Sequence, residues 1–239
     1  FNIFLNRGKI LKLASGVTED IENNWFVGEP IGAIYNYRRL GIWQNTPEDI
    51  ALAEKYGLVT DMTKSDCVIG TVKVADLNGD DKLDSKDREI IGTRQPDFEG
   101  GITNTLAYKN FDFSVVAYFK VGGLMKSQIH DDWTNTLQGG KNNVKVNYWT
   151  PDNNENYWPK PNSGKQWPDY RSTLAYMDAS YLKIRTISLG YTFPVKTIKP
   201  LGIENARVYS TVSNPFTFFS EYKDKFGGLD PETDGSVGI

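Results

Sequence analysis

The sequence predicts an all-β fold: antiparallel strands of a large transmembrane β-barrel, with long loops that contain short helices. Several stretches alternate between apolar and polar residues with period two, which is typical of strands with two different faces. The connections between these stretches alternate between long and short, as they do in outer-membrane barrels. Aromatic residues make up 13% of the 239 residues and glycine is abundant, a mixture that favours strands and turns over helices.

The clearest strand is predicted over 111–121. Its odd-numbered positions are all apolar, whereas the even-numbered positions include Asp112, Ser114 and Lys120. The stretch is as long as the strand of about 9–11 residues that crosses a bilayer when tilted. A second strand is predicted over 101–109. Because little more than Asn110 separates the two stretches, they should form a tight hairpin.

Three further strands are predicted, over 181–193, 206–218 and 2–13. In the stretch 181–193 the apolar positions change phase near Thr186, which indicates either a β-bulge at that point or an upper half of the strand that lies outside the membrane. The stretch 206–218 begins with clean alternation, whereas 2–13 alternates more weakly. The chain should therefore contribute about five strands to a barrel wall.

Long loops are predicted over 14–95, 122–180 and 219–239, and in a barrel they would lie on its outer side. The first loop contains a predicted surface helix over 46–57. Thr46 can cap that helix, and a proline in its first turn and a glycine at its end are typical helix boundaries. A second short helix is predicted over 127–137.

Composition excludes several classes of function. The net charge of −3 provides no basic field for nucleic acid. No stretch approaches the ~20 apolar residues of a membrane-spanning helix. With one cysteine and one histidine, the chain has no internal disulfide framework, and a catalytic triad would have to use that one histidine. We expect Cys67 to be a small, half-buried residue and His130 to be a polar loop residue. No organic cofactor is predicted.

One stretch has the spacing of a calcium-binding loop, with oxygen ligands at loop positions one, three, five, seven, nine and twelve. In order, these residues are Asp76, Asn78, Asp80, Lys82 through its backbone carbonyl, Asp84 and Asp87. Two positions depart from the pattern, because Asp81 replaces the glycine at position six and Asp87 replaces a glutamate at position twelve. The alternative is a solvated acidic turn held by its own Asx hydrogen bonds.

Tryptophan and tyrosine are concentrated between 133 and 181. Such rings can stack on a sugar or a peptide, but most aromatic side chains pack within their own protein. We therefore favour packing and interfacial contacts, and the sequence identifies no ligand-binding residue. The residues are Trp133, Tyr148, Trp149, Tyr157, Trp158, Trp167, Tyr170, Tyr176 and Tyr181.

Short motifs occur in a fixed order along nearly the whole chain. They are Val27-Gly28-Glu29-Pro30-Ile31-Gly32, Tyr35 with Tyr37, Gly41-Ile42-Trp43-Gln44, the acidic loop followed by Arg88-Glu89-Ile90-Ile91-Gly92, Pro96, Tyr108-Lys109-Asn110-Phe111-Asp112, Ser180-Tyr181-Leu182-Lys183-Ile184-Arg185, Leu189-Gly190-Tyr191-Thr192-Phe193-Pro194 and Asp230-Pro231-Glu232. In this order they resemble the C-terminal third of SusC/RagA family TonB-dependent outer-membrane transporters.

The resemblance implies that residues 1–239 all belong to the C-terminal part of such a barrel. The family imports glycans or peptides for nutrient uptake across the outer membrane of Gram-negative, Bacteroidetes-type bacteria. The implied partners are the rest of the barrel and its plug, membrane lipid, a SusD-like lipoprotein, and TonB, which supplies energy. The plug, the TonB box and the final strand are expected outside this sequence. The resemblance implies no enzymatic activity.

Two other functions remain open at this point. A secreted, calcium-stabilised β-sandwich that binds glycans through its tryptophans would also show alternation, although it has no reason to sort its loops by length. A glycoside hydrolase would need a pair of carboxylates, and no such pair can be identified among the acids of the loops.

Overall fold

The computed structural model describes residues 1–127, 130, 146–161, 169–228 and 230–233. The chain forms two compact units. Unit 1 consists of Phe1–Asn6, Pro96–Gly123 and Ala179–Glu221, and unit 2 consists of Arg7–Gln95, Leu124–Asp178 and Tyr222–Ile239. The stretches expected to be long loops therefore fall mostly in unit 2, whereas the long strands make up unit 1.

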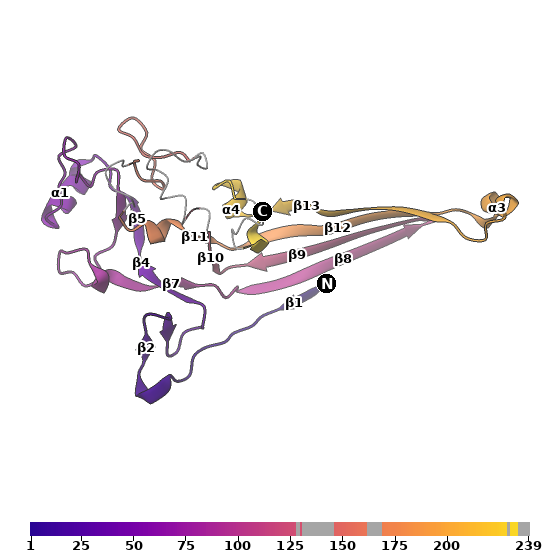
Figure 1. Cartoon of the computed structure of the whole chain (residues 1–239), viewed down its shortest axis with the longest axis horizontal. Helices are drawn as coiled ribbons and strands as arrows, with labels where there is room; N and C mark the ends of the chain where they lie inside the picture. The colour runs from indigo at the N-terminus through magenta and orange to yellow at the C-terminus, as the bar shows by residue number, and fades with distance from the viewer. Residues whose placement is uncertain (128–129, 131–145, 162–168, 229, 234–239) are drawn as a thin grey trace. The chain divides into compact units, whose positions relative to one another are not determined.

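Unit 1 is one sheet of five strands in the order β1-β8-β9-β12-β13 (Figure 1). The bounds are Asn2–Phe4 for β1, Phe98–Tyr108 for β8, Phe111–Val121 for β9, Tyr181–Thr192 for β12 and Arg207–Phe218 for β13. Every neighbouring pair is antiparallel. The sheet therefore follows the chain order, as a run of hairpins does.

The observed strands differ from the expected ones mainly at their ends. The stretch 111–121 coincides with β9, whereas β8 begins at Phe98, before the expected start at 101. The strand expected over 2–13 is much shorter, because β1 ends at Phe4. Phe4 pairs with Glu99, and β8 begins one residue earlier, at Phe98. Residues after Phe4 therefore have almost no part of β8 with which to pair.

A β-bulge interrupts β12 where the sequence predicts one. The register of β12 shifts between Ile184 and Thr186 against both β9 and β13. Arg185 is the extra residue. Successive side chains of a strand alternate in direction, so one extra residue places Ile187 on the same face of the sheet as Ile184. The prediction of a bulge near Thr186 is confirmed.

One face of the sheet exposes its apolar side chains. Leu106 in β8, Phe111 in β9 and Val212 in β13 are 59%, 50% and 52% exposed. Phe113 and Phe119 are only partly buried as well. A soluble sandwich would bury such side chains in its interior. The arrangement therefore favours the membrane-barrel prediction over the β-sandwich alternative.

The opposite face carries polar contacts that cross between strands. Tyr118 donates a hydrogen bond to Glu99 on the neighbouring strand. An ion pair joins Arg207 Nη2 in β13 to Asp112 Oδ2 in β9 at 2.6 Å, and it passes over Gly190 of the intervening strand β12. A Cβ atom on Gly190 would lie 2.6 Å from Asp112 Oδ1. The missing side chain at this position makes room for the ion pair.

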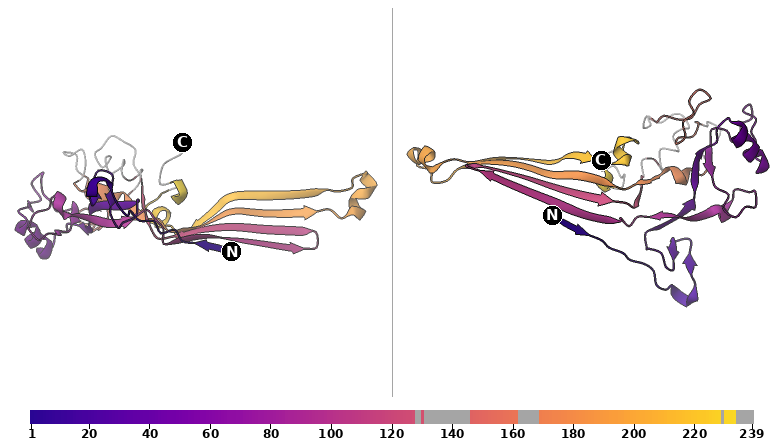
Figure 2. Two further views of the ribbon diagram at one scale, coloured as in Figure 1. Left: turned by 90° about the horizontal axis from the view of Figure 1, so that it is seen from below. Right: turned by 180° about the vertical axis from the view of Figure 1, so that it is seen from behind.

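Both short connections of unit 1 lie at the same end of the sheet (Figure 2). The β8–β9 hairpin turns through Lys109 and Asn110, with Lys109 in the left-handed region at φ 54°. The β12–β13 connection contains two short helical turns, α3 (Val195–Ile198) and η5 (Lys199–Leu201). The tight hairpin expected at Asn110 is confirmed.

The described residues of unit 2 form four two-stranded sheets and several short helices. The pairs are β2 (Glu19–Asp20) with β3 (Trp25–Phe26), β4 (Ala33–Tyr37) with β7 (Arg88–Thr93), β5 (Arg39–Ile42) with β6 (Val72–Val74), and β10 (Leu124–Lys126) with β11 (Tyr176–Asp178). The helices are η1 (Ala14–Gly16), α1 (Pro47–Lys55), η2 (Ser85–Asp87), η4 (Arg171–Leu174), α4 (Glu221–Asp224) and η6 (Pro231–Thr233).

Helix α1 forms where the sequence predicts a surface helix. The Thr46 hydroxyl accepts a hydrogen bond from the amide of Asp49, which satisfies one of the unpaired donors at the helix start. Glu48 and Asp49 in the first turn also interact favourably with the helix dipole. The second helix, expected over 127–137, lies almost entirely outside the described residues. No described helix is long and apolar enough to span a membrane.

Two residues of unit 2 are more buried than the sequence indicates. Cys67 and His130 are each 2% exposed. The thiol is thus fully buried rather than half-buried, and His130 is not an exposed loop residue. The His130 ring stacks on Trp158, with ring centres 5.2 Å apart, and the edges of Tyr222 and Phe226 face it. Aromatic neighbours distant in sequence explain why the local polar context was misleading.

Candidate functional site

The acidic loop wraps its own backbone around its side chains. Asp76 accepts hydrogen bonds from the amides of Gly79 at 2.7 Å and Asp81 at 3.0 Å. Asn78 accepts one from the amide of Asp80, and Asp80 accepts one from the amide of Lys82. Each short side chain thus binds an amide two to five residues further along, which curls the chain tightly.

Asp87 closes the loop from its last position. The carboxylate is fully buried and accepts hydrogen bonds from the amides of Leu77 at 3.0 Å and Asp84 at 2.8 Å. Asp84 in turn accepts a hydrogen bond from the amide of Lys86, so the two acids form a capping box at η2. The first and last turns of the loop are therefore tied together through one side chain.

Asp81 adopts the conformation for which calcium loops usually use glycine. Its φ is 62°, in the left-handed region, which aspartate tolerates better than most residues. Its carboxylate forms an ion pair of 2.7 Å with Lys55 at the end of α1. The departure at position six therefore does not prevent the sharp turn.

The loop has the turn that calcium needs, but its carboxylates are directed at backbone amides. Among the described residues, no group of three or more His, Cys, Asp and Glu side chains is arranged to hold a metal ion. The six residues stand in the order that calcium ligation requires. The hydrogen bonds, however, equally fit the alternative of a turn held by Asx interactions. Calcium binding at this loop stays a prediction.

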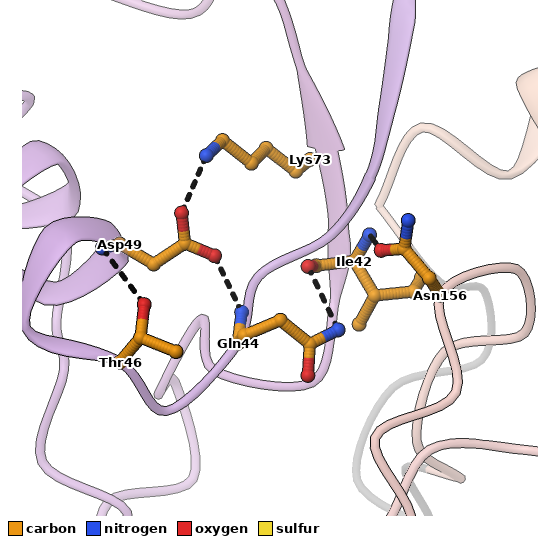
Figure 3. Close-up of polar contacts among 6 residues, drawn as sticks. All are labelled: Ile42, Gln44, Thr46, Asp49, Lys73 and Asn156. Carbon is orange, nitrogen blue, oxygen red and sulfur yellow. Dashed lines mark hydrogen bonds and ion pairs between the residues drawn. The ribbon is translucent and has the colours of Figure 1, made fainter.

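A polar network joins residues 146–161 to the β5–β6 pair and α1 (Figure 3). The side-chain oxygen Oδ1 of Asn156 accepts a hydrogen bond of 2.9 Å from the amide of Ile42, at the end of β5. Gln44 donates to the carbonyl of Ile42 and accepts a hydrogen bond of 2.8 Å from the Trp149 indole. These contacts connect two parts of the chain more than 100 residues apart.

Asp49 extends this network on the helix side. Its carboxylate accepts a hydrogen bond of 2.7 Å from the amide of Gln44 and forms an ion pair of 2.5 Å with Lys73 on β6 (Figure 3). The Lys73 ammonium also lies 4.7 Å from the centre of the buried Trp43 ring. The motif Gly41-Ile42-Trp43-Gln44 thus has a structural role that the sequence alone does not reveal, because Asn156 and Trp149, which bind it, are distant along the chain.

A cavity of about 800 Å³ lies beside the acidic loop. Its walls include Tyr37, Trp43, Leu83 and Tyr170. The Tyr170 hydroxyl donates to the carbonyl of Leu83 at 3.1 Å, and its ring meets Tyr37 edge-on. Burial raises the pKa of Tyr170 to about 12, so the hydroxyl stays a donor at all ordinary pH values. The loop is therefore attached to the wall of this cavity.

The described aromatic residues between 133 and 181 differ in burial. Trp149, Trp158 and Tyr181 are buried, whereas Tyr148 is exposed. The favoured interpretation, that these rings stabilise structure, is confirmed for the buried ones. Trp133 and Trp167 lie outside the described residues.

Known proteins resemble this chain both in amino-acid sequence and in three-dimensional structure. No family model matches the chain. It is 30% identical to the TonB-dependent receptor P3 of Formosa agariphila over 97% of this chain and 23% of that protein. It is 32% identical to the TonB-dependent receptor SusC of Bacteroides thetaiotaomicron over 68% of this chain and 15% of that protein. The chain thus spans less than a quarter of these two relatives.

Solved structures of RagAB have the same fold. One, of the RagAB peptide importer in the open-open state, matches with a TM-score of 0.67 and 21% identity, over 99% of this chain and 24% of the matched chain. Another, of the RagAB peptide transporter, matches with a TM-score of 0.66 and 22% identity, over 96% of this chain and 23% of the matched chain. The likeness extends over both units.

Proposed function

Because this chain is a segment of the barrel of a SusC/RagA-type TonB-dependent transporter, we propose that the whole protein imports nutrients across the bacterial outer membrane. The observation that carries the proposal is the exposed apolar face of strands β8, β9, β12 and β13 in a chain that matches such receptors along nearly its whole length. In this role, unit 1 supplies barrel wall and unit 2 supplies loops.

The edges of the sheet support this role. Strands β1 and β13 each have a single neighbour, so each presents backbone groups without a partner strand in the described residues. Lipid offers no hydrogen bonds to such groups, so a spanning sheet has to close on further strands. The remainder of the barrel, with its plug, is therefore the first partner that we assign to this chain.

The names of the relatives support a proposal for the substrate and the remaining partners. One relative is SusC, and the matched structures are of a peptide importer. We assign glycans or peptides as the substrate class, a SusD-like lipoprotein as the partner at the loops, and TonB as the source of energy. The named relatives are receptors and importers, and transport rather than catalysis is the role that fits this chain.

Deletion of the gene that encodes this chain tests the assignment. The deletion strain should lose growth on either a glycan mixture or a peptide mixture as the sole carbon source, and keep growth on a monosaccharide. The intact gene supplied in trans should restore growth. An affinity tag on the transporter should also recover a lipoprotein from detergent extracts. Unchanged growth on both mixtures would contradict nutrient import.

We further propose that the loop from Asp76 to Asp87 binds Ca²⁺ and stiffens the outer part of the protein. A ligand at a hundred times its dissociation constant stabilises a folded region by about 2.7 kcal/mol. Calcium should therefore slow hydrogen exchange of the loop amides in the purified transporter, and a chelator should reverse the effect. Asp80→Ala should abolish the response, whereas Asp66→Ala, an acid outside the loop, should retain it. Identical exchange with calcium and with chelator would exclude the site.

A further inference from the structure

Arg39, in strand β5, carries a buried donor that is not satisfied. Its Nη1 atom is shielded from solvent and has no hydrogen-bond partner among the described residues. The guanidinium carbon lies 3.8 Å from the centre of the Tyr157 ring, which covers one face of the group. Burial lowers the pKa of Arg39 from its ordinary value, but a guanidinium remains protonated in proteins. One N–H group of a permanently charged, partly buried side chain is therefore held away from water.

Glu155 and Glu89 are each bound to groups other than Arg39. Glu155 acts on Arg39 only through its field, because its carboxylate accepts hydrogen bonds from the amides of Asn156 and Tyr157 and from the side chain of Asn147. Glu89 forms its ion pair with the neighbouring Arg38, with 2.8 Å between Nη2 and Oε2. An unpaired donor on a buried charged group is costly, so an external anion would be stabilising at this position.

Arg39 also lines a cavity, which has a volume of about 310 Å³ and lies within unit 2. Tyr37, Tyr157 and Tyr176 form part of its wall, and Ile91 and Leu124 provide an apolar side. The volume is at the lower end of the range for ligand pockets, about 300–1,000 Å³. The cavity can therefore hold a small molecule or one side chain of a larger one.

We propose that this cavity binds a carboxylate carried on a small apolar group, with the Arg39 guanidinium as the anion-binding residue. The planar fork of an arginine matches a carboxylate in geometry. The phenols of Tyr37 and Tyr176 are additional donors in the wall, and Ile91 with Leu124 contacts the apolar part. A dianion is disfavoured, because the second cation of the cavity, Arg38, is already paired with Glu89.

The test uses the whole transporter that contains this chain, reconstituted in nanodiscs. Binding of 3-fluorobenzoate and of its neutral counterpart 3-fluorobenzamide is measured by fluorine NMR at constant ionic strength. The benzoate should bind at least about tenfold more tightly, since hydrogen bonds to charged groups are the strong ones. Equal binding of acid and amide, or no binding of either because an acid from elsewhere in the transporter occupies Arg39, would overturn the proposal.

Two variants locate the effect. Arg39→Met should weaken benzoate binding about ten- to a hundredfold and leave benzamide unchanged. Arg38→Met, the matched control in the same wall, should bind benzoate like the wild type. Loss of the preference in Arg38→Met alone would overturn the assignment to Arg39. If Arg39→Met does not fold, the comparison of acid with amide on the wild type still decides the proposal.

A second pair of probes distinguishes the sources of the carboxylate. N-acetylleucine and its amide present the same side chain with and without the free carboxylate of a peptide end. If N-acetylleucine binds more tightly than 3-fluorobenzoate, the cavity is assigned to peptide C-termini. If N-acetylleucine binds more weakly, the cavity is assigned to small free acids. Either result supports a carboxylate site, whereas no difference between N-acetylleucine and its amide would contradict it.

Discussion

His130 is held by two hydrogen bonds of opposite direction. Its Nε2 lies 3.0 Å from the carbonyl oxygen of Phe226, which only accepts, so Nε2 carries the proton. Its Nδ1 lies 2.6 Å from the Ser127 hydroxyl and accepts from it in the neutral ring. A second proton would place a donor at Nδ1 and a charge among three aromatic rings. The neutral form is therefore the one that fits.

The pH dependence of this part of unit 2 follows from that arrangement. Burial lowers the pKa of His130 below its ordinary value of 6.5. The unfolded segment then binds a proton more readily than the folded one, so the contribution is complete above pH 6.5 and is lost as pH falls toward the lowered pKa. Hydrogen exchange at the Gly228 amide, which bonds to Tyr222, should accelerate between pH 7 and pH 5 beyond its intrinsic dependence.

The control for this prediction is His130→Gln, which keeps polar atoms and removes the titration. In the variant, protection of the Gly228 amide should be lower at neutral pH and should change little with pH. His130 is the single histidine of this sequence, so no other side chain here has its ordinary pKa in the same window. The same acceleration in the variant would show that another group is responsible.

Gly190 and the ion pair above it depend on each other. A Gly190→Val side chain would occupy the space between Arg207 and Asp112 and force them apart. The substitution should therefore destabilise the barrel through the same interaction that Asp112→Asn removes. Residues that act through one contact show non-additive effects. In urea unfolding of the purified transporter, the double variant should be no less stable than the less stable single variant. Additive losses would show that Gly190 has a separate role.

At the scale of elements, β9 has two faces that a single charge can distinguish. Val115 lies on the apolar face, opposite Asn104 and Ile187 in the neighbouring strands. An arginine that meets lipid near mid-depth costs about 2–4 kcal/mol. Val115→Arg should therefore lower the yield of folded transporter in the outer membrane and its midpoint in urea.

Ser114→Arg is the matched control, because Ser114 is the adjacent residue and points to the opposite face. It should leave insertion and the urea midpoint close to those of the wild type. Equal effects of the two substitutions would contradict the assignment of the apolar face to lipid.

The connection between β5 and residues 146–161 can be tested at Asn156. The Ile42 residue is buried, and its amide has the Asn156 side chain as its acceptor. Asn156→Ala would leave that donor unsatisfied, at a cost of about 1–3 kcal/mol. The Ile42 amide should then exchange faster with solvent. Asn156→Asp keeps an acceptor oxygen and should retain protection. If the Ile42 amide exchanged equally fast in Asn156→Ala and Asn156→Asp, water would be replacing the Asn156 side chain without cost.

At the scale of the whole molecule, the long strands were predictable and most of unit 2 was not. The alternation in 111–121 and the phase change near Thr186 are local signals, since the side chains of any strand alternate with period two. The boundaries of β1 and β8 depend instead on pairing. Phe4 pairs with Glu99, and this partnership leaves no local pattern in either segment.

The pairs of short strands in unit 2 were missed for the same reason. β5 pairs with β6 across the intervening helix α1, and β4 pairs with β7 across α1 and the acidic loop. These strands are too short for their alternation to stand out. The acidic loop is different, because its spacing is local and its hydrogen bonds follow that spacing. Only its occupancy by a metal depends on something that the chain does not contain.

The Asn156 contact also bears on the order of folding. The Ile42 amide and its acceptor are separated by 114 residues, and strands β8 and β9 lie between them along the chain. Bringing such distant segments together is entropically expensive, and proteins rich in non-local contacts fold slowly. The Ile42 amide therefore lacks this acceptor until residues 146–161, which follow the β8–β9 hairpin along the chain, have reached it. We expect this contact to be among the last in unit 2 to form.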